Sequence, residues 1–118
     1  MNKKIYDGEL KLMELIWLNE PISAKNVSLI ATDKIGWNKN TTYTVLKKLE
    51  SKGYIKRSDP GFICTSLISK NAICKSETKN LADKLFGGSK KALFSALLED
   101  EDLTKNDIDE LRRMIEER

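Results

Sequence analysis

The sequence predicts a mostly α-helical protein with a small β-hairpin wing, arranged as an N-terminal winged helix-turn-helix plus a C-terminal helical dimerisation module. Two observations lead to this fold class. First, a helix with a polar outer face starts after Asn38 and runs directly into a two-stranded hairpin that ends at Thr65, as a recognition helix runs into its wing. Second, residues 69–118 contain only three apolar helical stripes, which bury too little surface to be stable alone.

The composition is that of a folded, soluble protein with one domain, or with one small domain and an appended module. Of the 118 residues, 33% are charged and 40% are hydrophobic, as in ordinary globular proteins. No apolar run reaches the length of about 18 residues that a membrane span needs, and the N-terminus lacks the apolar segment of a signal peptide. We therefore expect a cytoplasmic protein that does not insert into membranes.

The charges are divided unequally along the chain. Residues 1–70 carry 12 lysines and arginines against 7 acidic residues, whereas residues 71–118 carry 9 against 11. The first part therefore favours a polyanionic partner, and the second favours a protein partner. The chain has no histidine, and Cys64 and Cys74 lack the spacing of a metal site, so we expect no metal and no cofactor.

Two helices are predicted before the polar-faced helix. The first runs from a cap at Asp7 to about Leu18. Its inward positions are Leu10, Met13, Ile16 and Trp17, and its outward positions are Glu9, Lys11 and Glu14. The second follows a cap at Ser23 and spans residues 24–32. Its inner positions are Val27, Ile30 and Ala31. Trp37 is expected to fill the corner before the third helix, so both tryptophans are interpreted as packing residues and not as residues that stack on bases.

The third helix has one apolar and one polar face. Asn38 can cap it by accepting an N–H of its first turn. Its apolar stripe is Thr42, Val45, Leu46 and Leu49. Its opposite face carries Asn40, Thr41, Thr44, Lys47, Lys48 and Ser51, most of which can donate hydrogen bonds. Gly53 is placed to end the helix. Strands are then predicted at Tyr54–Arg57 and Phe62–Thr65, around the turn Ser58-Asp59-Pro60-Gly61.

Two functions of different classes fit this stretch. In a winged helix-turn-helix, Asn40, Thr41 and Thr44 would contact base edges of double-stranded DNA in the major groove. Lys48 would reach a phosphate or a guanine, and Lys47, Lys56 and Arg57 would supply salt-dependent affinity for phosphates. The alternative is a winged-helix protein–protein adaptor without sequence-specific DNA binding, in which the basic face is only solvated. An enzyme is not expected, because histidine, paired thiols and a glycine-rich phosphate loop are all absent.

The C-terminal part is predicted to form three further helices. Ser69 can open a helix that runs to about Phe86, and Gly87-Gly88 ends it. Ser89 can cap the next helix, and Thr104 with Asp107 resembles the capping box of the last. The apolar residues expected to form a dimer interface are Leu81, Leu85, Leu93, Phe94, Leu97, Leu98, Ile108, Leu111 and Ile115. This part either packs back on the first domain or is completed by a second copy, and a two-fold homodimer would also place two reading helices on a palindromic site.

Taken together, these segments are similar to the BlaI/MecI penicillinase repressors, also called the BlaI/MecI/CopY transcriptional regulators, over nearly the whole chain. The similarity rests on the order and spacing of several short segments. These are Asp7-Gly8-Glu9-Leu10, Met13, Ile16-Trp17, Trp37 with Thr41, Thr44 and Leu46, Leu49 with Lys52-Gly53, Leu85-Phe86-Gly87-Gly88, Leu98-Glu99 and Ile108-Asp109-Glu110-Leu111.

The resemblance implies a winged-helix DNA-binding domain, residues 1–68, and a helical dimerisation domain, residues 69–118. It also implies a dimeric repressor that binds an inverted-repeat operator and silences β-lactamase or related antibiotic-resistance genes. The DNA-reading positions of the family fall on Asn38, Asn40, Thr41, Thr44 and Lys48. Lys56 and Arg57 of the wing would meet phosphate.

Three departures from the family pattern bear on regulation. The wing tip is shorter and less basic than is usual in the family. In the penicillinase repressors induction proceeds by cleavage of an Asn-Phe bond in the fifth helix. This chain has Ala96-Leu97 at that place, so that cleavage specificity is not carried over, and a sensor protease stays a possible partner. The chain has no C-x-C thiols near its C-terminus, so copper sensing is not expected. Proteolysis in the fifth helix and a small ligand between the domains both stay open as ways of release.

Overall fold

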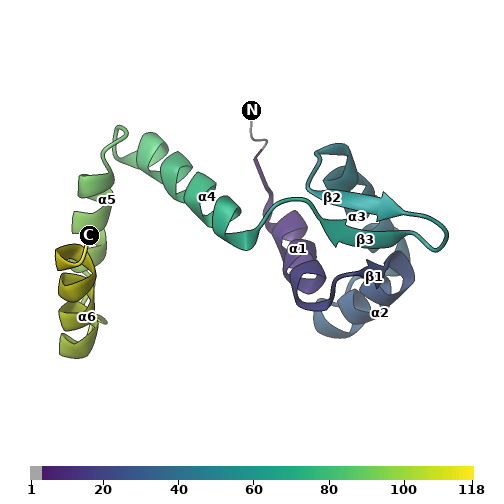
Figure 1. Ribbon diagram of the computed structural model, residues 1–118, viewed down its shortest axis with the longest axis horizontal. Coiled ribbons are helices and arrows are strands. Elements are labelled where there is room, and N and C mark those ends of the chain that lie inside the picture. Colours follow the sequence, from purple (N-terminus) through teal and green to yellow (C-terminus); the bar gives the residue numbers. More distant parts are fainter. Residues whose placement is uncertain (1–3) are drawn as a thin grey trace. The chain divides into compact units, whose positions relative to one another are not determined.

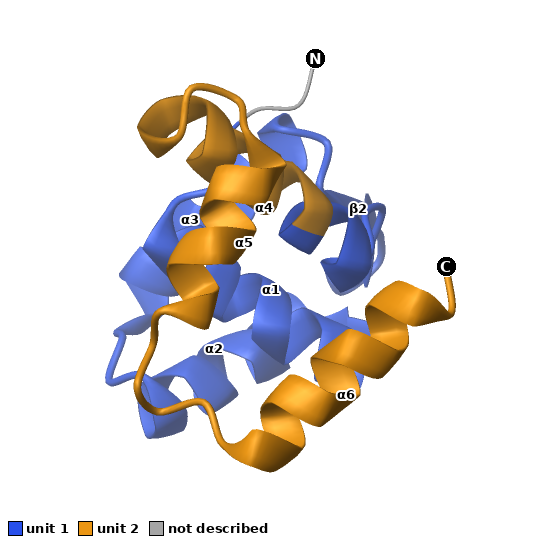
Figure 2. Ribbon diagram, turned by 90° about the vertical axis from the view of Figure 1, so that its left-hand side faces the viewer, with its two compact units in different colours: residues 1–74 blue, residues 75–118 orange. Residues whose placement is uncertain are grey.

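The computed structural model describes residues 4–118 and divides the chain into two compact units, residues 1–74 and residues 75–118 (Figure 2). The first unit holds three helices and three strands among its described residues (Figure 1). They are α1 (Asp7–Asn19), β1 (Ile22–Ser23), α2 (Ala24–Lys34), α3 (Lys39–Ser51), β2 (Ile55–Ser58) and β3 (Ile63–Ser66). Helix α4 (Lys70–Leu85) begins in this unit and continues into the second, which also contains α5 (Lys90–Leu98) and α6 (Lys105–Glu116).

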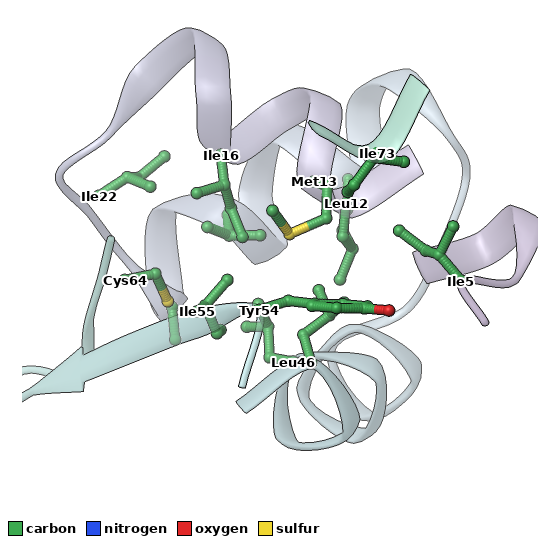
Figure 3. Close-up of a cluster of buried hydrophobic side chains, with 14 residues drawn as sticks. Ile5, Leu12, Met13, Ile16, Ile22, Leu46, Tyr54, Ile55, Cys64 and Ile73 are labelled. Carbon is green, nitrogen blue, oxygen red and sulfur yellow. The ribbon is translucent and has the colours of Figure 1, made fainter. Parts of the chain in front are cut away.

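The core of the first unit lies where α1, α2, α3 and the sheet meet (Figure 3). Its fully buried side chains include Leu12, Met13 and Ile16 from α1, which face Leu46 from α3. Thr42, Leu49, Ile55 and Cys64 are the other large, fully buried side chains from α3 and the sheet. The predicted stripe of α3 is thereby confirmed for Thr42, Leu46 and Leu49, which are buried, whereas Val45 is half-buried. This packing directs the opposite face of α3 to solvent.

The sheet has one strand more than the predicted hairpin. Its strand order is β1-β3-β2, and both pairs are antiparallel. The additional strand β1 is only two residues long and pairs Ile22 with Cys64, so it was too short to be recognised from sequence periodicity. The other strands begin one residue later than predicted. For β2 the reason is that the N–H of Tyr54 donates to the carbonyl of Leu49, 3.0 Å away, and closes the C-terminus of α3.

The prediction that Glu9 faces outward is wrong. Glu9 is only 4% exposed, because its Oε1 accepts hydrogen bonds from the N–H of Tyr6 at 2.9 Å and from Nζ of Lys52 at 2.7 Å. A buried carboxylate is tolerated when it is paired in this way. The cap of α1 also differs, since Tyr6 precedes the helix and Asp7 is its first residue.

The first turn of α4 belongs to the winged-helix unit. Nε1 of Trp17 donates to the carbonyl of Ile68 at 3.0 Å, and Lys70 forms an ion pair with Glu14 at 3.0 Å. Ile73 is buried in the core of this unit. These contacts attach the segment between β3 and α4 to helix α1. The first unit therefore extends to Cys74.

The helices of the second unit have the predicted caps. The Ser89 hydroxyl accepts the N–H of Ala92, and Thr104 and Asp107 form a capping box at the start of α6. Helix α6 contains no buried residue. An apolar groove of about 280 Å³ runs between α5 and α6. It is lined mainly by Phe94, Leu98, Ile108, Leu111 and Ile115. Among the described residues, no helix combines the length and the apolar character needed to cross a membrane.

Candidate nucleic-acid interface

The structure presents one polar face of α3 and the adjacent hairpin to solvent. Every side chain that we predicted to contact DNA is exposed. These are Asn38, Asn40, Thr41, Thr44, Lys47 and Lys48 on or before α3, and Lys56 and Arg57 on β2. The face is exposed because Thr42, Leu46 and Leu49, on the opposite side of α3, are buried in the core.

Asn38 caps α3 as predicted, and this role limits what its side chain can offer to DNA. Its Oδ1 accepts the backbone N–H of Thr41 at 2.8 Å. The side-chain oxygen of an asparagine N-cap is therefore engaged, whereas the NH₂ group still has two donors. Asn38 can donate to a phosphate or a base acceptor, but it cannot form a two-bond pair with adenine while it caps the helix.

Asn40 and Thr44 are linked through the helix backbone. The hydroxyl of Thr44 donates to the carbonyl oxygen of Asn40 at 2.9 Å. Within residues 4–118, the side-chain amide of Asn40 and the hydroxyl of Thr41 have no hydrogen-bond partner. Asn40 therefore retains both the donor and the acceptor that a bidentate pair with adenine requires.

The lysines around α3 have different environments. Lys47 and Lys48 are exposed, and Lys48 borders a hollow of about 410 Å³ that is also lined by Tyr6 and Val45. Lys39 is a further exposed cation of this surface, with its Nζ 5.7 Å from the ring centroid of Tyr43. Sequence reasoning missed Lys39, although its place directly after the cap residue could have indicated a phosphate contact.

Lys52 follows the C-terminal end of α3 and is not part of this surface. Its Nζ is 2.7 Å from Oε1 of Glu9, 3.0 Å from the carbonyl of Lys4 and 4.6 Å from the ring centroid of Tyr6. The ammonium group is thus held between α1 and α3. Its charge is paired with Glu9 inside the winged helix, and we do not count it among the cations available to DNA.

The wing is built around Phe62, which sequence reasoning also missed. The guanidinium carbon of Arg57 lies 4.1 Å from the Phe62 ring centroid, and Nε of Arg57 lies 3.3 Å from Oδ1 of Asp59. Phe62 also packs edge-to-face on Tyr43 of α3, with 6.1 Å between ring centroids. Its φ of +50° is in the left-handed region, and its carbonyl accepts the N–H of Ala24 at 2.8 Å. The sequence signal that could have indicated this role is the position of Phe62, an aromatic residue directly after the turn glycine Gly61.

The cysteines offer no reactive centre at this surface. The pKa of the Cys64 thiol is raised from 9.0 to about 11, mainly by burial and also by the nearby charge of Glu50, against the opposing effect of Arg57. A thiol with a raised pKa is a poor nucleophile at neutral pH. Among residues 4–118, no three histidine, cysteine or acidic side chains gather as a metal site would require.

Two known proteins are similar to this chain over nearly its whole length. The methicillin resistance regulatory protein MecI of Mammaliicoccus sciuri is 29% identical to this chain over 120 residues, which cover 98% of each protein. The penicillinase repressor of Bacillus licheniformis is 25% identical over 116 residues, covering 97% of this chain and 91% of the relative.

Two solved structures are similar to part of the chain. The DNA-binding domain of the repressor BlaI gives a TM-score of 0.55 at 29% identity and covers 61% of this chain and 93% of that structure. The Bacillus licheniformis BlaI monomer, solved in complex with the blaP half-operator, gives 0.54 at 27% identity and covers 61% of this chain and 90% of that structure. These likenesses confirm the winged-helix fold.

The family match extends beyond the region covered by the solved structures. Residues 5–117 match the penicillinase repressor family. The chain therefore belongs to the penicillinase repressor family, whose members are transcriptional repressors and not enzymes.

Proposed function

We propose that this chain is a DNA-binding transcriptional repressor that acts as a homodimer on an inverted-repeat operator and controls genes of antibiotic resistance. The observation that carries the proposal is the exposed polar face of α3 beside a basic wing, in a chain that matches a repressor family over residues 5–117. Its relatives are named as regulators of methicillin resistance and of penicillinase. The similar BlaI structure holds a half-operator. The proposal places the chain in the cytoplasm, where bacterial DNA lies.

In this proposal α3 enters the major groove and the wing contacts the adjacent backbone. Asn40 pairs with adenine, and Thr41 and Thr44 contact neighbouring bases. The phosphate contacts come from Asn38, Lys39, Lys47, Lys48, Lys56 and Arg57. Because these contacts release counterions, the affinity for any duplex falls as salt rises.

Dimerisation is proposed to occur through the second unit. Several large apolar side chains there are exposed, among them Leu85 at 64%, Leu97 at 59% and Ile115 at 56%. The groove between α5 and α6 is lined mainly by Phe94, Leu98, Ile108, Leu111 and Ile115. In the proposal a second copy covers this groove together with the exposed Leu81, Leu85 and Leu97. Leu93 is only 9% exposed, so we now assign it to packing within the chain.

For release from the operator we propose a cut within α5, at or near Ala96 and Leu97, by a protease that responds to a sensor. Both residues are exposed. A cut there would separate each DNA-binding unit from α6 and so weaken the dimer. The second DNA-binding unit would then no longer be held near its half-site, and the affinity for the operator would fall. The test is the intact mass of the chain isolated from cells before and after induction. Fragments ending near residue 96 support proteolysis, whereas an intact chain on a derepressed promoter would assign release to a ligand.

The function is tested by selecting the purified chain against a pool of random duplexes and sequencing the bound fraction. A repressor enriches an inverted repeat and binds it more weakly as salt rises. An adaptor enriches nothing and shows no steep salt dependence, and that outcome would contradict the proposal.

The dimer is tested separately by sedimentation equilibrium. Replacing Ile115, which is 56% exposed, by Asp should convert the dimer to a monomer, because a charge would be buried in the interface. Leu18→Asp is the matched control, since Leu18 is an apolar residue of α1 that is 80% exposed. If both variants remain dimeric, the second unit is not the interface.

A further inference from the structure

Of Asn40, Thr41 and Thr44, which are proposed to contact bases, Thr44 has its side-chain hydrogen-bond donor engaged by the backbone. A threonine hydroxyl has a single proton, and that of Thr44 lies in the hydrogen bond to the carbonyl of Asn40 at 2.9 Å. With the proton engaged, Thr44 cannot donate to the major-groove acceptors, which are N7 and O6 of guanine, N7 of adenine and O4 of thymine. What remains is a methyl group and the acceptor capacity of the oxygen.

The same hydrogen bond decides which of these two groups faces the DNA. In a helix, threonine is restricted to few χ1 positions, and in one of them Oγ1 reaches back to the carbonyl four residues earlier. Thr44 adopts this arrangement. Its oxygen therefore points toward the helix backbone. The methyl group, which is the other branch at Cβ, then points away from that hydrogen bond. Because Thr44 is exposed on α3, the methyl group is the part of this side chain that a base edge would meet.

We propose that Thr44 reads a thymine through contact between its methyl group and the C5-methyl group of the base. This assignment rests on the proposed function, because it requires α3 to lie in the major groove. Thymine is the only base that presents a methyl group there. Asn40 and Thr41, which keep free polar groups, would read the neighbouring positions by hydrogen bonds. The half-site is thus expected to contain a thymine that is recognised without any hydrogen bond from Thr44.

The test uses the operator enriched by the full-length chain. Each thymine of the half-site is replaced in turn by uracil, which removes only the C5-methyl group, and the dissociation constant is measured by fluorescence anisotropy. One position should weaken binding by about fivefold per half-site, which is the effect of losing one buried methyl group. If the wild-type chain is indifferent to uracil at every position, the proposal is overturned.

Three substitutions identify the residue that makes the contact. Thr44→Val keeps a methyl group in the same place and should bind the thymine operator as the wild type does. Thr44→Ser loses the methyl group and should bind about fivefold more weakly per half-site, with no further loss when the critical thymine is also replaced by uracil. Thr41→Ser is the matched control in the same helix, and its effect should add to that of the uracil.

The outcomes separate this inference from the function on which it rests. If Thr44→Ser binds as the wild type does and Thr44→Val binds weakly, the hydroxyl oxygen makes the contact and the methyl assignment is wrong, while the repressor function stands. If the wild-type chain enriches no sequence from the pool, the proposed function fails and this assignment fails with it. Thermal unfolding of each variant shows whether a loss of affinity reflects a loss of fold, and the uracil scan of the wild type is independent of every substitution.

Discussion

Oδ1 of Asp59 lies 3.3 Å from Nε of Arg57 at the tip of the wing. The carboxylate thus occupies one side of a cation that is proposed to contact a DNA phosphate. One face of the guanidinium group lies over the ring of Phe62, with its carbon 4.1 Å from the ring centroid. An acidic residue in this position weakens the attraction of the wing for a polyanion.

Replacing Asp59 by Asn should therefore tighten DNA binding. Asparagine is also favoured in turns, so the hairpin should be retained. We expect an affinity about two- to fivefold higher at low salt, equally for operator and random duplexes, because the wing contacts phosphates and not bases. Fluorescence anisotropy at several salt concentrations measures the change. Asp109→Asn, in α6, makes the same change in net charge, and an equal gain with this control would show that only the total charge matters.

Removing Lys52 from its buried ion pair with Glu9 should destabilise the winged helix. The side chains of Glu9 and Lys52 are 5% and 18% exposed, respectively. Lys52→Met would keep most of the aliphatic stem but leave a buried carboxylate without its cation, and should lower the free energy of unfolding by about 2–4 kcal/mol. Denaturant unfolding provides the value. Lys70→Met is the matched control, because its ion pair with Glu14 is much more exposed and should contribute less than about 1 kcal/mol. Similar losses for both variants would contradict this account.

The two thiols should differ in reactivity. Cys74 is exposed, whereas Cys64 is buried and burial raises its pKa to about 11. At pH 8 a thiol reagent should label Cys74 in the native chain and Cys64 only after unfolding. Equal labelling rates for the two cysteines in the native state would show that Cys64 is accessible.

The raised pKa of Cys64 also predicts a loss of stability in alkali. The unfolded thiol loses its proton near its ordinary pKa of 9.0, whereas the folded thiol keeps it until about pH 11. Since the folded state then holds more protons, its stability falls as the pH rises between these values. Denaturant unfolding of the wild type and of Cys64→Ala between pH 8 and 11 measures this contribution as the difference between their slopes. Parallel pH profiles would contradict it.

Trp17 should fix the path of the segment that joins β3 to α4. Its Nε1 donates to the carbonyl of Ile68 at 3.0 Å, in the segment that joins β3 to α4. Trp17→Phe should lower stability by about 1–2 kcal/mol through the lost hydrogen bond and the smaller ring. It should also weaken the preference for one half-site spacing, because α4 leads to the proposed dimer interface. Binding to operators with one or two extra central base pairs tests this. A single half-site duplex is the control, and its affinity should not change.

Local signals in the sequence predicted much of this fold. Asn38 and the pair Thr104 and Asp107 form the expected caps, because an N-cap is decided within one helical turn. Gly53, with φ of +79°, follows the C-terminus of α3 as expected. The burial of Glu9 was not predictable in this way, because it depends on Lys52, which is 43 positions away in the sequence.

The candidate site was predicted as a set of residues but not as a chemical surface. Periodicity placed Asn40, Thr41 and Thr44 on the outer face of α3, and all three are exposed. It could not show that the proton of the Thr44 hydroxyl is engaged by the backbone, since threonine has two accessible χ1 positions in a helix. The contact between Phe62 and Tyr43 was also beyond local patterns, because it joins the wing to α3.

The central claim is that α3 distinguishes one DNA sequence from another. The most direct measurement is the dissociation constant of the wild-type chain for the selected inverted repeat and for a scrambled duplex of the same composition, each over a range of salt concentrations. We predict at least a roughly hundredfold preference for the repeat, with both affinities falling as salt rises. Equal affinity for the two duplexes would contradict sequence recognition by α3 and leave only a charged surface.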